Sequence, residues 1–345
     1  MNPNHWYPAA FSDELKREQV IETRFMGDDI ALYRGADGVA RAVENRCAHR
    51  HIKLSHGSVE GCKLVCLYHG WTYDERGCLT DMKHDHFGKK LPVVRIGAYP
   101  VKERYGILWF FPGDEALAAI TPLPELPHAD EWPGLRFAYE WKAHHSMIID
   151  NLCNLTHLWV HGRWVPYGDT ILADSSAEAD RLTLHWEHDL RRDVMHPLTA
   201  PFFRREKGSN RSDTHMIYDY PYQSAVSNHR VRSNNFMLPL DETTTKVFTY
   251  QIWEPPERVP ARVFRLAMPL IKPITLEIFR QDGFTVEEEQ KSYLQHGHRG
   301  MPEPNPMVRQ FNALTVRKWE DYLQYQQTGE LTEAQRAEQT RLKVM

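Results

Sequence analysis

The first third of the chain alternates apolar and polar residues over short stretches, a pattern typical of β-strands with one buried face. Two pairs of such stretches meet at 35–38 and at 74–77, where Asp37-Gly38 and Arg76-Gly77 supply residues that tolerate positive φ. Each turn therefore predicts a β-hairpin. The apolar stretch 105–111 predicts a further strand, which ends at Pro112-Gly113. We expect an all-β domain at the N-terminus.

The stretch 121–134 separates this region from the rest of the chain. It contains four prolines. Proline has no backbone N–H, so this stretch suits neither a regular helix nor a central strand. We place the domain junction here, with a first domain over 1–120 and a second over 121–345.

The second domain changes character along its length. Strand-like stretches at 137–145 and across 180–255 are followed by a helical pattern, and 147–161 is a further helix candidate. The C-terminal helix candidates are 258–268, 284–297, 306–326 and 331–343. The last of them begins with a capping box at Thr332 and Gln335. Strands followed by helices predict an α+β fold in which helices cover an antiparallel sheet.

Composition narrows the class of protein. The 345 residues include 42 Lys and Arg against 46 Asp and Glu, a net charge of −4, which argues against a nucleic-acid partner. The longest apolar runs are far shorter than the roughly 18 residues of a membrane span, and the N-terminus shows no secretory signal. Five cysteines suit a reducing cytoplasm better than a disulfide scaffold. Nineteen histidines prompt a search for metal ligands.

Two mixed pairs form the strongest motif. Cys47-x-His49 and Cys66-x2-His69 are separated by sixteen residues. A zinc site also uses two Cys and two His, but zinc fingers usually pair Cys with Cys and His with His. Mixed pairs at two loop tips suit a two-iron cluster better, with thiolates on one iron and imidazoles on the other.

With Gly70-Trp71 following the second pair, this motif resembles a Rieske [2Fe–2S] domain. Rieske proteins of respiratory complexes carry an extra cysteine in each cluster loop. Here those positions hold Ile52 and Tyr68. The resemblance is therefore to the ferredoxin and oxygenase branch, and it implies cluster ligands Cys47, His49, Cys66 and His69.

A second constellation lies at His157 and His161. They are four residues apart, so on a helix both side chains would leave one face and could bind one metal ion. Taken alone, such a pair is more often structural or exposed. The segment 150–161 resembles the iron-binding helix of Rieske non-heme iron oxygenases, Asn-x2-Asp-x2-His-x3/4-His, of the vanillate O-demethylase-like and carbazole-dioxygenase-like types. The three-residue spacer matches the latter type.

The resemblance also implies a third iron ligand, a carboxylate on a later helix within 283–294. Spacing to the apolar residues Tyr293 and Leu294 points to Gln290, whereas ligand chemistry favours Glu289, because an anionic oxygen binds Fe(II) better than an amide. Glu288 is also open, and so is the alternative that these acids form a solvated helix face.

Asn154 departs from the family pattern. Family members have Asp at this position, which bridges a cluster histidine of one subunit to an iron histidine of its neighbour. An amide still accepts a hydrogen bond but carries no charge, so the coupling between the two centres is expected to differ. The resemblance implies a role for Asn154 on the electron route, together with His157 and His161 at the iron.

The resemblance implies the oxygenase component of a multicomponent monooxygenase or dioxygenase, with a Rieske [2Fe–2S] cluster and mononuclear Fe(II). It would hydroxylate or demethylate a small aromatic or heteroaromatic substrate with O₂. The chain has no G-x-G-x-x-G fingerprint, so NAD(P)H would deliver its electrons through a separate reductase or ferredoxin. A head-to-tail homotrimer, or a related hetero-oligomer, is implied as well.

Two alternatives remain from the sequence. The chain could be an electron-transfer or structural Rieske subunit whose impaired iron site supports an active partner chain; Asn154 and the uncertain third ligand motivate this alternative. It could also be a zinc-binding interaction protein. Iron counting separates the first alternative from an oxygenase, and the brown colour of a Rieske cluster separates the second.

Overall fold

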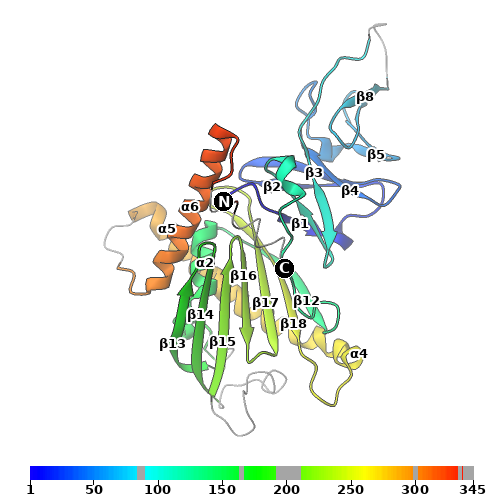
Figure 1. Ribbon diagram of the computed structural model, residues 1–345. Coiled ribbons are helices and arrows are strands. Elements are labelled where there is room, and N and C mark those ends of the chain that lie inside the picture. Colours follow the sequence, from blue (N-terminus) through cyan, green and yellow to red (C-terminus); the bar gives the residue numbers. More distant parts are fainter. Residues whose placement is uncertain (84–89, 163–166, 192–210, 298–301, 333–335, 337–345) are drawn as a thin grey trace. The chain divides into compact units, whose positions relative to one another are not determined.

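The computed structural model describes the chain except for residues 84–89, 163–166, 192–210, 298–301, 333–335 and 337–345 (Figure 1). The chain forms two compact units. The N-terminal unit comprises Asn2–Leu123 with Leu238–Glu242, and the C-terminal unit contains Pro124–Met237 and Thr243–Met345. The division expected between residues 120 and 121 stays a prediction. Among the described helices, none is both long and apolar enough to cross a membrane.

The N-terminal unit is built from three antiparallel sheets, as the alternating pattern predicts. One has the order β1-β11-β10, the second β2-β3-β4-β9 and the third β5-β6-β7-β8. The bounds of the first two sheets are β1 Tyr7–Phe11, β11 Ile107–Phe110, β10 Val101–Arg104, β2 Gln19–Phe25, β3 Asp28–Arg34, β4 Ala40–Glu44 and β9 Ala98–Tyr99. The third sheet consists of β5 Ser58–Glu60, β6 Lys63–Val65, β7 Trp71–Tyr73 and β8 Leu79–Met82. The short helices are η1 Ser12–Glu14, η2 Leu54–His56 and α1 Glu115–Ala118.

Both predicted hairpins are present. β3 and β4 pair on either side of the turn that contains Gly38, and β7 and β8 pair on either side of the turn that contains Gly77. Both glycines have positive φ, 82° at Gly38 and 76° at Gly77. A Cβ at Gly77 would also lie 2.2 Å from the carbonyl oxygen of Ile96, so this position excludes any side chain.

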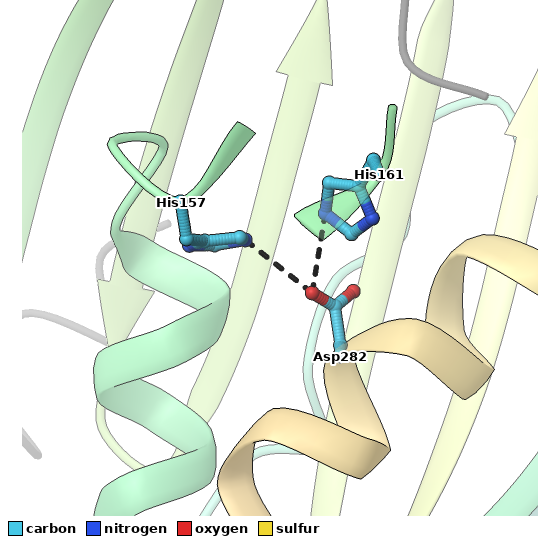
Figure 2. A group of neighbouring side chains, drawn as sticks. All are labelled: His157, His161 and Asp282. Atoms are coloured by element: carbon cyan, nitrogen blue, oxygen red, sulfur yellow. Dashed lines mark ion pairs between the residues drawn. The ribbon is translucent and has the colours of Figure 1, made fainter. Parts of the chain in front are cut away.

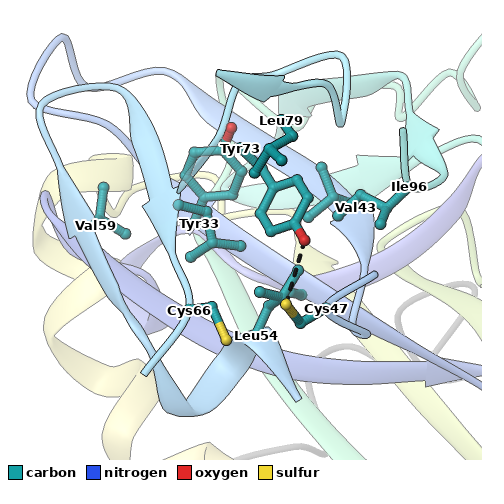
Figure 3. Close-up of a cluster of buried hydrophobic side chains, with 11 residues drawn as sticks. Tyr33, Val43, Cys47, Leu54, Val59, Cys66, Tyr73, Leu79 and Ile96 are labelled. Atoms are coloured by element: carbon teal, nitrogen blue, oxygen red, sulfur yellow. Dashed lines mark hydrogen bonds between the residues drawn. The ribbon is translucent and has the colours of Figure 1, made fainter. Parts of the chain in front are cut away.

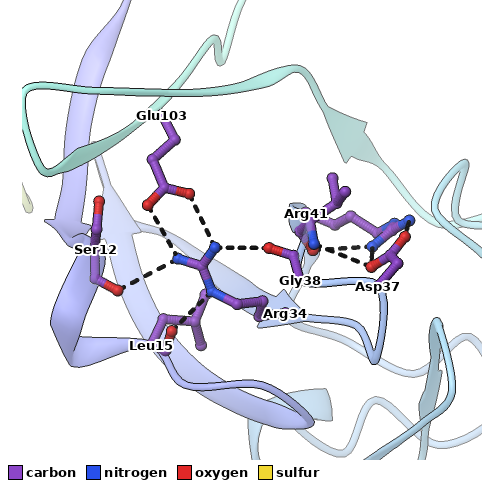
Figure 4. A network of polar contacts seen from close by, with 8 residues as sticks. Ser12, Leu15, Arg34, Asp37, Gly38, Arg41 and Glu103 are labelled. Carbon is purple, nitrogen blue, oxygen red and sulfur yellow. Dashed lines mark hydrogen bonds and ion pairs between the residues drawn. The ribbon is translucent and has the colours of Figure 1, made fainter.

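Arg34 links the first two sheets of this unit (Figure 4). Its guanidinium donates to Glu103 Oε2 at 2.9 Å, to the Leu15 carbonyl at 2.8 Å and to the Gly38 carbonyl at 2.8 Å. The five donors of a guanidinium form a rigid fork, so one side chain fixes β3, β10 and the turn after β3 together. The first cluster loop, which follows β4, is thereby attached to two braced sheets.

The C-terminal unit contains a seven-stranded antiparallel sheet with the order β12-β18-β17-β16-β15-β14-β13. Its strands are β12 Gly134–Trp141, β13 Tyr167–Ala177, β14 Arg181–Leu190, β15 Arg211–Asp219, β16 Tyr222–Ser227, β17 Val231–Pro239 and β18 Thr245–Trp253. β17 and β18 are buried along most of their length, whereas the edge strand β13 is largely exposed. The α+β class with an antiparallel sheet is confirmed.

Helices complete this unit (Figure 1). They are α2 His145–Cys153, η3 Leu158–Val160, α4 Ala261–Phe264, η4 Arg265–Ala267, α5 Met268–His296 and α6 Pro306–Thr328. α5 is much longer than the predicted helix 284–297. The predicted helix 331–343 lies almost wholly outside the described residues.

The helix predicted over 147–161 is wrong in its extent, because α2 ends at Cys153. Asn154 follows in an extended conformation, with φ −112° and ψ 116°. Its Oδ1 accepts hydrogen bonds from the backbone N–H of Thr156 at 3.0 Å and from the Thr156 hydroxyl at 2.7 Å. Asn side chains compete with helical hydrogen bonds in this way. The chain therefore turns before His157 instead of continuing as a helix.

Candidate cluster and iron sites

The first cluster loop begins directly after β4. The N–H of Cys47 donates to the Ile52 carbonyl at 2.9 Å, and the N–H of His51 donates back to the Cys47 carbonyl at 2.9 Å. His51 has φ 57°, which closes the loop tightly. These bonds fix Cys47 and leave His49 at the loop tip.

The second loop, between β6 and β7, repeats this arrangement. The N–H of Cys66 donates to the Trp71 carbonyl at 2.8 Å, and the N–H of Gly70 donates to the Cys66 carbonyl at 3.0 Å. Gly70 has φ 65°, and a Cβ there would lie 2.7 Å from the Lys83 side chain. The two halves of the motif therefore adopt equivalent loops, with His69 at the second tip.

The four predicted ligands divide into a buried pair and an outer pair. Cys47 and Cys66 are 2% and 3% exposed, within the core shown in Figure 3. His49 is exposed and His69 is half-buried, and their ring centroids are 4.6 Å apart. Two inner thiolates and two outer imidazoles are the donor set of a Rieske cluster. The residues present therefore fit the group.

Tyr73 connects the core to the inner pair. Its hydroxyl lies 3.2 Å from Cys47 Sγ (Figure 3) and accepts a hydrogen bond from the N–H of Ala48 at 3.1 Å. Because that oxygen already accepts from Ala48, its own proton is available to the sulfur. Hydrogen bonds, first with Cys66 and then with Tyr73 and the loop N–H groups, together lower the pKa of Cys47 to about 5 against the effect of burial. Hydrogen bonds to cluster sulfurs are one determinant of a cluster's reduction potential.

The iron candidates converge on one carboxylate. The Nε2 atoms of His157 and His161 each lie 3.3 Å from Oδ1 of Asp282, which α5 supplies (Figure 2). Asp282 is 5% exposed and His161 is 4% exposed, whereas His157 is partly open. The ligand atoms of all three lie within 4.8 Å of one another.

The charges of this group are mutually supporting. Burial acts to raise the pKa of Asp282, but the two neighbouring imidazoles outweigh this effect and lower the pKa. Burial acts to lower the pKa of His161, and Asp282 reverses this effect and raises it. Asp282 Oδ1 is a buried oxygen without a well-aligned hydrogen bond among the described residues. A buried carboxylate oxygen between two imidazoles fits a divalent metal ion.

Gln281 orients one of the imidazoles. Its Oε1 lies 3.2 Å from His161 Nδ1, and its own amide nitrogen donates to Glu277 at 3.0 Å. We assign the ring proton to Nδ1 because a neutral His must donate to an amide oxygen. This tautomer leaves the Nε2 lone pair directed toward Asp282 and the metal position. Metal-binding histidines commonly use their second ring nitrogen in this way.

The structure does not place the predicted third-ligand candidates beside the two histidines. Gln290 is buried, and its Oε1 accepts a hydrogen bond from the N–H of His144 at 2.8 Å. Glu288 pairs with Lys291 at 2.5 Å. Glu289 is exposed. Asp282, which lay outside the predicted range, is the carboxylate that lies beside both histidines.

Two further expectations change. His157 and His161 do not project from one helix face; His157 lies in the turn after α2, and His161 follows η3. They still converge because α5 brings Asp282 between them (Figure 2). Asn154 uses its amide oxygen locally, on Thr156. Its bridging role therefore stays a prediction.

Comparisons with known protein families agree with this geometry. Residues 5–92 match the Rieske [2Fe–2S] domain, and residues 141–325 match the vanillate O-demethylase oxygenase C-terminal domain. The chain thus joins a cluster domain to an oxygenase domain. It belongs to the vanillate O-demethylase-type branch of the Rieske oxygenases, which are oxidoreductases that use O₂ with a [2Fe–2S] cluster and non-heme iron.

Individual relatives support this assignment. A 4beta-methylsterol monooxygenase of Methylococcus capsulatus is 37% identical over 94% of this chain and 90% of that protein. The vanillate O-demethylase oxygenase subunit of a Pseudomonas species is 37% identical, but over 46% of this chain and 44% of that protein. Among solved structures, dicamba monooxygenase bound to dicamba shares the fold with a TM-score of 0.73 at 18% identity, over 92% of this chain and 96% of that one.

Proposed function

We propose that this chain is the oxygenase component of a multicomponent monooxygenase that oxidises a methyl group on an apolar, sterol-like ring system. The observation that carries the substrate class is the similarity to the 4beta-methylsterol monooxygenase. It extends over both domains at 37% identity, whereas the vanillate O-demethylase subunit and the toluene-4-sulfonate monooxygenase subunit of Comamonas testosteroni match about half of the chain. A substrate pocket is built by the whole catalytic domain, so full-length similarity has more weight here.

We further propose Cys47, His49, Cys66 and His69 as the cluster ligands and His157, His161 and Asp282 as the iron ligands. Two imidazoles and one carboxylate leave one face of the metal open for dioxygen and substrate. The cluster supplies electrons one at a time, and the iron supplies the chemistry of oxygen insertion. The chain's own residues do the positioning: Gln281 holds the His161 tautomer, and Tyr73 stabilises the Cys47 thiolate.

The proposed electron source is NAD(P)H, acting through a separate reductase or ferredoxin in the cytoplasm. The exposed His49 and the half-buried His69 suit contact with such a partner, because they form the outer side of the cluster site. In the proposed head-to-tail homotrimer, the cluster loops of one chain serve the iron site of the next. Asn154 is the proposed contact, on the neighbour's side, to a cluster histidine.

One of the two observations that favoured a structural Rieske subunit with an impaired iron site no longer supports it. It depended on Asn154 and on the lack of a certain third ligand, and Asp282 supplies a buried carboxylate at that place. A small aromatic substrate remains the second candidate, because the vanillate O-demethylase and toluene-4-sulfonate relatives are named for such compounds.

Substrate-dependent O₂ uptake tests the proposal. The iron- and cluster-loaded protein is supplied with NADH and a surrogate reductase, and is offered a 4-methylsterol or a methoxylated benzoate. We expect O₂ uptake and a product heavier by one oxygen atom with the sterol. The Asp282→Ala protein is the matched control and should give neither. Turnover of the benzoate alone would replace the sterol assignment with the aromatic one, and turnover of neither would reject both.

A further inference from the structure

A second histidine and carboxylate group lies in the C-terminal unit, away from the iron candidates. His185 of β14 and His215 of β15 are direct register partners, and Asp213 precedes His215 by two residues on β15. Side chains two residues apart on a strand share a face, and so do direct partners on paired strands. All three side chains therefore leave the same face of the sheet.

This face is opposite to the one that the helices cover. Tyr218 lies on the other face of β15 from His215, and its ring contacts Phe311 of α6 at 5.7 Å. Gln223, the register partner of Tyr218, donates to the Leu152 carbonyl of α2 at 3.3 Å. α2 and α6 thus lie on the Tyr218 side. The group of His185, Asp213 and His215 is separated from them by the thickness of the sheet.

The geometry is close to that of a metal site. Asp213 Oδ2 lies 3.6 Å from His215 Nε2 and 3.9 Å from His185 Nε2. Ligand distances of about 2.1 Å in a tetrahedron place neighbouring ligand atoms roughly 3.4 Å apart. The observed distances are slightly longer than this, and too long for hydrogen bonds between the carboxylate and the rings. A modest contraction would bring all three atoms onto one ion.

The buried carboxylate of Asp213 is not fully hydrogen-bonded within the described part of the chain. Asp213 is 2% exposed, and among the described residues its Oδ1 and His185 Nε2 are buried atoms without a hydrogen-bond partner. A buried carboxylate is costly unless it is paired, hydrogen-bonded or bound to a metal. Its register partner Glu187 adds a second acid to the same face. A cation at this position would compensate both.

We propose that His185, Asp213 and His215 form a second metal site, which binds Zn²⁺ and links β14 to β15. Two imidazoles and one carboxylate are an established zinc donor set, and water or Glu187 would complete the tetrahedron. At a given N/O site zinc also binds more tightly than ferrous iron. The two rings are now stacked, with centroids 4.3 Å apart at 5°. Binding requires both rings to turn about their Cβ–Cγ bonds, so that each lone pair points at the ion.

The test is a zinc titration of the iron- and cluster-loaded protein, with iron and zinc both measured by elemental analysis after gel filtration. We expect one zinc per chain beyond the iron. Asp213→Asn should weaken zinc binding by about 10-fold or more while the iron content stays unchanged, because a neutral amide is a poorer ligand. His296→Gln, an exposed histidine at the end of α5, is the matched control and should bind zinc normally.

His157→Ala separates this site from the iron site. If zinc occupies the proposed position, this variant loses mononuclear iron but retains zinc. Zinc binding that is lost in His157→Ala and kept in Asp213→Asn would overturn the proposal, and so would the absence of stoichiometric zinc. Because a buried Asp variant can fail to fold, His185→Gln is measured as well. It should lose zinc and also the zinc-induced rise in melting temperature that we expect for the native protein.

Discussion

The two cofactor sites of this protein are held in different ways. The cluster ligands lie on two short loops of one small β unit, and each loop is closed by its own backbone hydrogen bonds. The iron candidates come from a turn, from the residue after a 3₁₀ helix, and from a long helix that follows more than a hundred residues later. The cluster site is therefore a local structure, whereas the iron site exists only when the catalytic domain is packed. Substitutions in the cluster loops and substitutions at the iron site should therefore have separable effects.

The largest expected effect is loss of the cluster. His69→Ala should remove the visible absorption of the cluster and abolish turnover, because one iron loses an imidazole ligand. His157→Ala should abolish turnover equally but keep that absorption. Absorption spectra and acid-labile sulfide distinguish the two variants. Cys62→Ser, at a half-buried cysteine outside the motif, should keep both properties. A coloured His69→Ala protein would refute the ligand assignment.

The next effect concerns the third iron ligand. Asp282→Ala should lower iron from about three to about two atoms per chain, since the cluster retains two, and should reduce turnover by about 100-fold or more. Glu289→Ala should leave the iron content at about three atoms per chain. Elemental analysis of both variants, prepared side by side, decides between them. The opposite pattern would restore the ligand that sequence spacing favoured.

The difference between the two sites also explains which residues the sequence could predict. The predicted cluster ligands are encoded within single loops, so their spacing alone predicts them, and the structure places their side chains close together. The hairpins at Gly38 and Gly77 were predictable for the same reason, because a turn depends on a few adjacent residues. The histidine pair was found as well, although not its conformation, because the hydrogen bonds of Asn154 end the helix early.

The sequence prediction missed the Asp282 carboxylate for a physical reason. Which acid of a long helix faces the two histidines depends on how α5 packs, and neighbouring acids differ only in their rotation about the helix axis. The predicted range 283–294 begins one residue after Asp282. One signal was present: Asp282 lies on the apolar side of the helix, eight residues before the buried Gln290 and four before the buried Val286. Its helical spacing from Val286 would have marked Asp282 as the acid on the buried side of the helix.

An intermediate effect tests whether the two sites cooperate between chains. His69→Ala and His157→Ala chains, each inactive alone, should regain about one quarter of native activity when co-expressed in equal amounts as a head-to-tail trimer. Half of the chains then have an intact iron site, and half of those adjoin an intact cluster. Turnover per total chain, measured on the unselected trimers, gives this fraction; in doubly tagged trimers it should rise to about one third, because each mixed trimer has one such pair among its three chains. Zero activity in trimers that contain both chains would show that each cluster serves its own chain.

The smallest expected effect is that of a single hydrogen bond within the cluster site. Tyr73→Phe removes the hydroxyl that lies 3.2 Å from Cys47 Sγ without changing the shape of the core. It should lower the reduction potential by an amount on the order of tens of millivolts, because a hydrogen bond to a cluster sulfur stabilises the reduced state. Tyr33→Phe is the matched control: Tyr33 is equally buried in the same core, but its hydroxyl has no hydrogen-bond partner among the described residues. A potentiometric titration, monitored by the absorption of the cluster, measures the reduction potential of both variants. Equal shifts would mean that core polarity, rather than this one hydrogen bond, sets the potential.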